Sequence, residues 1–130
     1  MDPQLNQAKE FQSSAKEDLP IFVKWIDFIK WLLTTTDNFP KKVRFTFTER
    51  MNNLALSVVE DLIEARYTRN KTPILRRANL SLEKIRVLIR LSYEMKLISR
   101  KSYEFSSFSI NEIGKVNHRP TPYFKFCRSL

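Results

Sequence analysis

Residues that could catalyse a reaction or hold a metal ion are scarce in this chain. The single histidine, His118, and the single cysteine, Cys127, lie in a proline-containing C-terminal segment that would not support a Cys–His pair rigidly. Zinc would need further Cys or His ligands, and one glycine cannot build a phosphate-binding loop. Glu60 and Glu64 share a helical face, as in di-iron bundles, but the Glu-x-x-His partners are missing. We therefore predict a non-enzymatic protein with no cofactor, metal or small-molecule substrate.

Positively charged residues offer a different chemistry, the binding of phosphates. The chain has 23 Lys and Arg against 14 Asp and Glu, a net charge of +9, which favours RNA, DNA or an acidic protein surface as partner. Several cations stand near predicted helix starts, where the helix dipole disfavours them, and phosphate binding would explain their placement. A solvated basic face is the alternative interpretation. The candidate binding residues are Lys41, Lys42, Arg44, Arg50, Arg76, Arg77, Arg86 and Arg90.

Aromatic residues near these cations are able to stack on unpaired bases. Most of them are explained equally well as core or tail residues. They are Phe45, Phe47, Tyr67, Tyr123, Phe124 and Phe126.

Length and composition indicate one helical domain. With 130 residues, 42% hydrophobic residues and a single glycine, the chain has the composition of long helices with few connections. Its longest apolar run, residues 21–33, is interrupted by Lys24, Asp27 and Lys30 and is too charged to cross a bilayer. The N-terminus has no signal-peptide pattern and one cysteine gives no support for secretion, so we expect a cytoplasmic protein without a membrane partner.

Helical periodicity predicts four helices, over about residues 19–35, 46–67, 73–97 and 99–116. A capping box formed by Thr46 and Glu49 is expected to start the second helix, Thr72 and Pro73 the third, and Ser99 the fourth. We assign residues 1–18 to a polar arm, 19–116 to a four-helix bundle, and 117–130 to a tail that holds two of the six prolines.

The expected core positions recur at helical spacing. They are Ile21, Phe22, Trp25, Ile26, Phe28, Ile29, Leu32 and Leu33 in the first helix; Phe47, Met51, Leu54, Val58 and Leu62 in the second; Leu75, Ala78, Leu82, Ile85, Ile89, Ser92 and Met95 in the third; and Tyr103, Ser106, Ile110 and Ile113 in the fourth.

Two further features of these helices bear on partners. A second apolar line on the third helix, formed by Leu80, Val87, Leu91 and Ile98, predicts an oligomer. Acidic Glu60, Asp61 and Glu64 stand near the end of the second helix, where the dipole disfavours them. They either pair with a neighbour's cations or form a solvated face.

Four stretches of sequence carry a family resemblance: FPKKVRFTFTERMNNLALSVVEDLIEARY (residues 39–67), RANLSLEKIRVLIRL (77–91), LISRKSYE (97–104) and NEIGK (111–115). Together they resemble the four-helix-bundle family that contains the accessory variability determinant of diversity-generating retroelements. The same family includes proteins encoded in intervening sequences of bacterial ribosomal RNA genes. The segment after Gly114 and Lys115 departs from the ending that many relatives have.

The resemblance implies an all-α, up–down antiparallel four-helix bundle that assembles as a homopentameric barrel. It also implies binding of RNA and DNA and association with a reverse transcriptase during mutagenic retrohoming. By similarity, Arg86 and Arg90 occupy the positions of paired arginines and are the first choice for the binding surface. Two alternatives remain open: an intervening-sequence protein whose partner is ribosomal RNA, and an interaction scaffold with an acidic protein partner.

Overall fold

A computed structural model describes residues 21–117, with side-chain detail for residues 21–114. The predicted arm, residues 1–18, and residues 118–130 of the predicted tail lie outside the described residues. Four helices make up the described part of the chain, and no strand occurs within it. The all-helical class and the number of helices predicted from the sequence are therefore confirmed.

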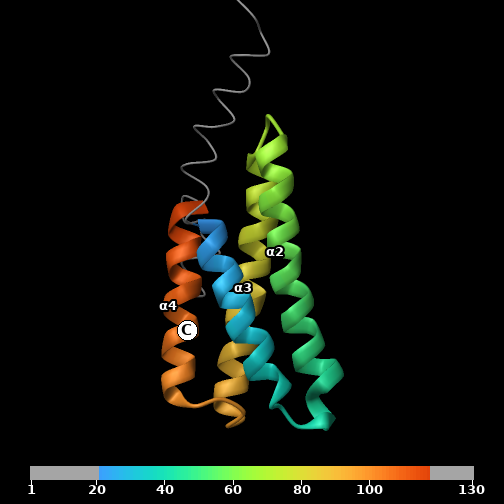
Figure 1. Cartoon of the computed structure of the whole chain (residues 1–130), viewed down its shortest axis with the longest axis vertical. Helices are drawn as coiled ribbons and strands as arrows, with labels where there is room; N and C mark the ends of the chain where they lie inside the picture. The colour runs from blue at the N-terminus through green and yellow to red at the C-terminus, as the bar shows by residue number, and fades with distance from the viewer. Residues whose placement is uncertain (1–20, 118–130) are drawn as a thin grey trace, which may run out of the picture.

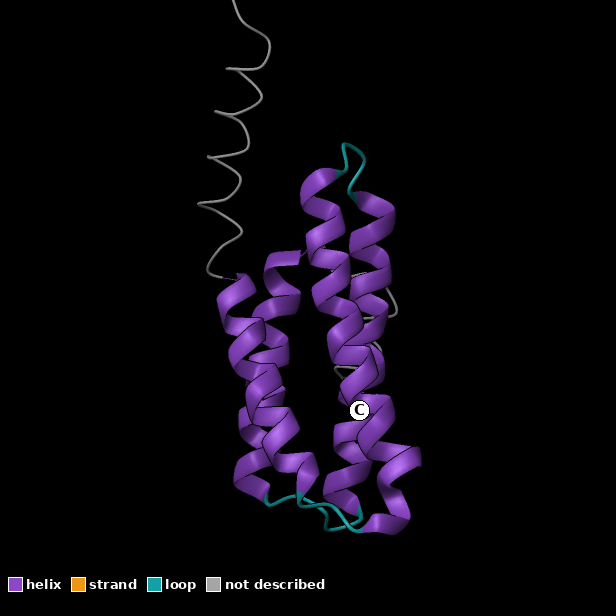
Figure 2. Ribbon diagram, turned by 45° about the vertical axis from the view of Figure 1, so that its right-hand side comes forward, coloured by secondary structure: helices purple, strands orange, loops and turns teal. Residues whose placement is uncertain are grey.

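The first helix covers residues 21–37 of the described chain. A short 3₁₀ turn, η1 (Lys41–Val43), and a π-helical turn, η2 (Arg44–Thr48), lead into α2 (Glu49–Tyr67). The remaining helices are α3 (Thr72–Glu94) and α4 (Arg100–Asn117). Two connections lie at one end of the molecule: the one that joins the first helix to α2 through η1 and η2, and the one between α3 and α4. The α2–α3 connection lies at the other end (Figure 1). Figure 2 shows that the α2–α3 pair extends beyond the described ends of the other two helices.

Specific contacts set which helices are neighbours. Trp25 of the first helix donates a buried hydrogen bond from Nε1 to the Ala55 carbonyl of α2, at 3.0 Å. On its other side, the first helix contacts α4 through the rings of Trp31 and Phe105, whose centroids are 5.2 Å apart. Tyr93 of α3 stacks on Tyr103 of α4 at 4.7 Å. Since α2 also packs along α3, the four helices enclose a common core.

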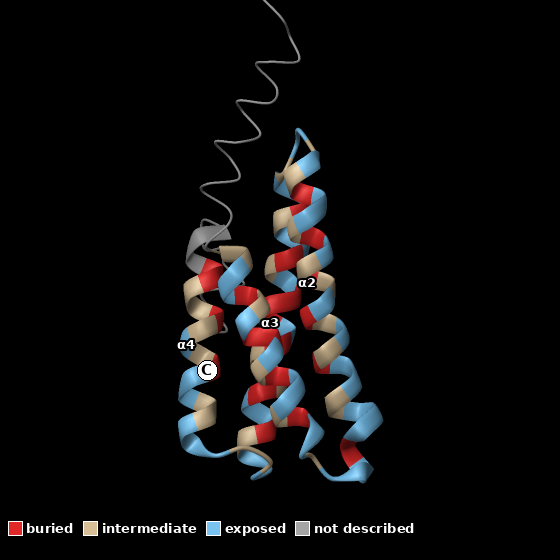
Figure 3. Cartoon of the chain, viewed as in Figure 1, coloured by how far each residue is buried: buried red, intermediate tan, exposed pale blue. Residues whose placement is uncertain are grey.

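The core is formed by one face of each helix (Figure 3). Its buried members are Trp25, Phe28, Ile29, Leu32, Met51, Ala55, Val58, Leu82, Ile85, Ile89, Ile110 and Ile113. All of these except Ala55 belong to the stripes expected from the sequence, which confirms the helical periods. Leu33 and Met95 were expected in the core but are half exposed, because Leu33 faces outward and Met95 caps the end of α3.

The predicted capping box at Thr46 is wrong. Thr46 lies inside η2 and its hydroxyl donates to the Val43 carbonyl at 3.4 Å, while α2 begins at Glu49 without a side-chain cap. The preceding turns supply backbone carbonyls to this region, so the first amides of α2 need no hydroxyl acceptor. Thr72 likewise makes no cap hydrogen bond, although Pro73 occupies the first turn of α3 as expected.

The predicted N-terminal cap of the fourth helix is confirmed, because the Ser99 hydroxyl accepts a hydrogen bond from the Ser102 amide at 3.1 Å. Just before it, α3 ends three residues earlier than predicted. Lys96 has φ of +62°, and the Leu97 amide donates to the Ser92 carbonyl at 2.8 Å while the Lys96 amide donates to the Tyr93 carbonyl at 2.9 Å. These two bonds form a Schellman motif, which closes a helix through a left-handed residue that is usually glycine.

Candidate nucleic-acid interface

The candidate cations do not form one patch but occupy three regions of the bundle. Lys41, Lys42 and Arg44 lie on η1 and η2, at the end that carries the two connections. Arg76 and Arg77 are near the start of α3, toward the opposite end. Arg50 lies in the first turn of α2, directly after η2, and Arg86 and Arg90 lie in the second half of α3, which ends at the same end of the bundle as η1 and η2.

Five of the eight are exposed and form no ion pair within the described part of the chain. They are Lys41, Lys42, Arg44, Arg50 and Arg76. Exposed cations of this kind can neutralise phosphates without first breaking an internal contact.

Arg77 is held by two carboxylates of α2. Its Nε donates to Asp61 at 2.9 Å, and its terminal nitrogen lies 2.7 Å from Asp61 and 2.6 Å from Glu64. These hydrogen bonds, that to Asp61 first, raise the pKa of the Arg77 guanidinium above its ordinary value, so it stays charged at every pH at which proteins are handled. Asp61 and Glu64, near the end of α2, thus pair with a cation of the same chain.

Arg86 lies largely inside the protein. Its side chain is 14% exposed, and its Nε stands 3.7 Å from Oε1 of Glu83, whose side chain is 7% exposed. The carboxylate oxygens of Glu83 accept no hydrogen bond within the described part of the chain. Glu83 therefore depends on the charge of the nearby guanidinium, which makes this pair a structural feature of α3.

Arg90 is more accessible than Arg86, with about half of its side chain exposed. It pairs with Glu94, one turn further along α3, at 3.1 Å. The hydrogen bond to Glu94, and next the neighbouring Tyr103, raise the pKa of Arg90 above its ordinary value. Arg90 is thus a charged surface residue with a salt bridge of the exposed kind, which contributes little to stability.

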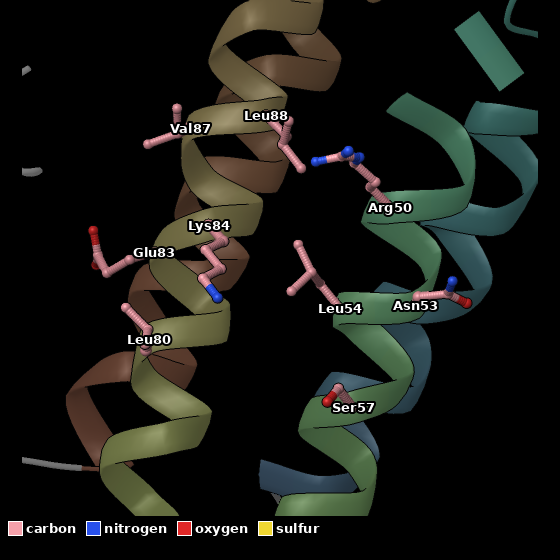
Figure 4. Close-up of a pocket in the computed structure, with 9 residues that line it drawn as sticks. All are labelled: Arg50, Asn53, Leu54, Ser57, Leu80, Glu83, Lys84, Val87 and Leu88. Atoms are coloured by element: carbon pink, nitrogen blue, oxygen red, sulfur yellow. The ribbon is translucent and has the colours of Figure 1, made fainter. Parts of the chain in front are cut away.

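A groove of about 770 Å³ runs between α2 and α3. Arg50 reaches from α2 toward Leu88 of α3, and Lys84 and Leu54 lie in the gap between the helices (Figure 4). Leu80 and Val87, two members of the second apolar line of α3, also border this groove and are 46% and 43% exposed.

Sequence reasoning missed three features of the candidate cations and the groove. Lys84 was not among the candidates, although it lies on the same helix as Leu80 and Leu88 at the spacing of four that places residues on one face. The burial of Arg86 was also missed, because spacing within α3 does not reveal how neighbouring helices cover it. The pairing of Arg77 with Asp61 joins residues 16 positions apart and has no local signal at all.

The described residues hold no group of three or more His, Cys, Asp or Glu side chains suited to a metal ion. His118 and Cys127 lie outside the described residues. No helix in the described part of the chain is long and apolar enough to cross a membrane.

Comparison with known protein families gives one match over most of the chain. A family described as bAvd-like matches residues 21–118, which include all four helices. Comparison with curated proteins and with solved structures gave no match.

Proposed function

Because the chain belongs to the bAvd-like family, we propose that it is the accessory protein of a diversity-generating retroelement, binding template RNA and also DNA. In this proposal it has no catalytic role and presents the nucleic acid to the element's reverse transcriptase. The observation that carries the proposal is the family match over all four helices. The net charge of +9 supports a polyanionic partner.

The assembly we propose is a homopentameric barrel of up–down antiparallel bundles. Its support is the line of half-exposed apolar residues on α3, since Leu80, Val87 and Leu91 remain 40–46% exposed in the single chain. Exposed apolar side chains gathered on one face of a helix can mark a protein interface. Static light scattering on a nuclease-treated sample tests this, with a mass of about 77.5 kDa (five times 15.5 kDa) expected. A monomer or dimer would refute the pentamer.

Titration of a labelled template RNA tests the binding itself. We expect affinity to fall steeply as salt rises from about 50 to 200 mM, because bound cations release counterions from the phosphates. Weak binding at the lowest salt would refute the proposal and favour an acidic protein partner. Co-purification with the element's reverse transcriptase tests the second partner, and failure of the two proteins to associate in the presence of template RNA would refute that part.

Two arginines provide a matched comparison for the binding surface. Arg90 and Arg100 each pair with a glutamate four residues further along, at 3.1 and 3.2 Å. Arg90→Gln and Arg100→Gln therefore remove the same charge and the same kind of salt bridge. We expect Arg90→Gln to weaken RNA binding more than Arg100→Gln, and equal effects would remove α3 from the proposed surface.

A further inference from the structure

Phe45 is an exposed aromatic residue within a basic segment of the described chain. Its neighbours along the sequence include Lys41, Lys42 and Arg44. Phe39 and Phe47 pack against the core, whereas Phe45 is 75% exposed to solvent. Packing in the core therefore does not explain why position 45 carries an aromatic side chain.

The local backbone explains how Phe45 comes to face solvent. Val43 is buried and Phe47 is half buried, so the chain is anchored on both sides of Arg44 and Phe45. Between these anchors the chain forms the π-helical turn η2, which contains no buried residue. Turns of this type are uncommon and frequently occur at functional sites.

The charges around Phe45 distinguish it from the other strongly exposed aromatic residue near cations. Tyr67, at the opposite end of α2, is 74% exposed and has Arg66, Arg69 and Lys71 near it along the chain. It differs from Phe45 in that the acidic Asp61 and Glu64, which pair with Arg77, precede it on the same helix. Residues 40–48 contain no acidic residue, and the nearest along the chain are Asp37 and Glu49.

A basic turn with an exposed ring suits one kind of ligand in particular. Lysine and arginine side chains neutralise backbone phosphates of any nucleic acid. An exposed ring adds a surface on which an unpaired base can stack, which a base inside a duplex cannot do. The combination therefore favours single-stranded over double-stranded nucleic acid.

We propose that Phe45, with Lys41, Lys42 and Arg44, forms a stacking site for an unpaired base of single-stranded nucleic acid. This inference rests on the proposed function and makes it more specific, because it places the contact at the η1–η2 end of the bundle. The site is formed by residues other than Arg86 and Arg90 of α3.

The experiment compares three full-length proteins, the wild type, Phe45→Ala and Tyr67→Ala, on two labelled probes. One probe is an unstructured single strand of about 15 nucleotides, within the size range of single-strand binding sites, and the other is a duplex of equal length. Fluorescence anisotropy is recorded between about 50 and 200 mM salt. Circular dichroism and light scattering verify the fold and the mass of each variant.

We expect Phe45→Ala to bind the single strand about tenfold more weakly than the wild type, the low to middle part of the range for one stacked base. Its affinity for the duplex and its salt dependence should stay the same, since no charge is removed. Tyr67→Ala should match the wild type on both probes. Neutralising both lysines, Lys41→Gln with Lys42→Gln, should lower the salt slope for the single strand by about 1.4, at about 0.7 for each phosphate contact.

Three results would overturn the stacking site: unchanged single-strand binding by Phe45→Ala, an equal loss on both probes, or a changed mass that shows Phe45 to be a subunit contact. In each of these the wild type still binds nucleic acid, so the proposed function survives. A wild-type protein that binds neither probe at the lowest salt would instead refute the proposed function.

Discussion

Replacing Arg86 by methionine should destabilise the protein strongly, although Arg86 was expected on the binding surface. The guanidinium lies 3.7 Å from the Glu83 carboxylate, and the two side chains are only 14% and 7% exposed. Removing one partner of a buried ion pair leaves the other charge buried without compensation, which lowers the free energy of unfolding by about 3–5 kcal/mol. We expect the lower end, about 3 kcal/mol, because the two atoms are further apart than in a hydrogen bond.

Urea denaturation followed by circular dichroism measures this loss directly. For a domain of this size, about 3 kcal/mol also corresponds to a fall in melting temperature of roughly 12 °C or more. The control is the double variant Glu83→Gln with Arg86→Met, which removes both charges and should recover most of the lost stability. Recovery would show that the effect comes from the charge on Glu83 and not from the volume of the arginine.

The refuting result is an Arg86→Met protein within about 0.5 kcal/mol of the wild type, the usual range for surface substitutions. Arg86 would then be a surface residue after all. If the expected loss is observed, changing Arg86 and Arg90 to glutamate together cannot separate binding from folding. Arg90→Gln, at a half-exposed position, is then the variant that reports on RNA binding alone.

Three smaller changes test the local structure by thermal and urea denaturation. Lys96→Gly should stabilise the protein by about 1 kcal/mol, because φ of +62° strains a residue with a Cβ. Lys96→Ala keeps the Cβ and should have little effect. Equal effects of the two substitutions would contradict the backbone strain at this position. Ser99→Ala should destabilise by about 1 kcal/mol through loss of the cap of α4, whereas Ser99→Asp should retain it. Trp25→Phe should lose about 1–2 kcal/mol, since the hydrogen bond to the Ala55 carbonyl disappears; an unchanged midpoint would show that this bond contributes nothing net.

The sequence predicted the helices and most of the core because both depend on local periodicity. Val58 on α2 and Ile85 on α3, for example, are both fully buried. A period near 3.6 places each of them on the apolar face of its own helix. The cap at Ser99 was predictable for the same reason, since donor and acceptor are three residues apart. Thr46 had the same local pattern and failed, because the helical turns before it changed which amides lacked an acceptor.

The candidate binding site was less predictable, because the availability of a charge depends on contacts between helices. Arg77 looks like a surface cation in the sequence, yet it is held by Asp61 and Glu64 of another helix. Arg86 has the spacing of an exposed position but is mostly covered. Counting cations along the chain therefore overstates how many can meet a phosphate without breaking an existing contact.

The candidate cations that form no ion pair within residues 21–114 give a better starting point for locating the nucleic acid. Lys41, Lys42 and Arg44 are close together along η1 and η2, and Arg50 follows in the first turn of α2. Arg76 lies near the start of α3, toward the other end of the bundle. Phosphates of a single strand follow one another closely, so a cluster of cations holds more of them at once than the same charges spread over the bundle. If a neighbouring subunit closes the α2–α3 groove at Leu80 and Val87, we expect the η1–η2 turns to be the basic surface that stays open. In the proposed pentamer, five copies of these turns would then be available to one RNA.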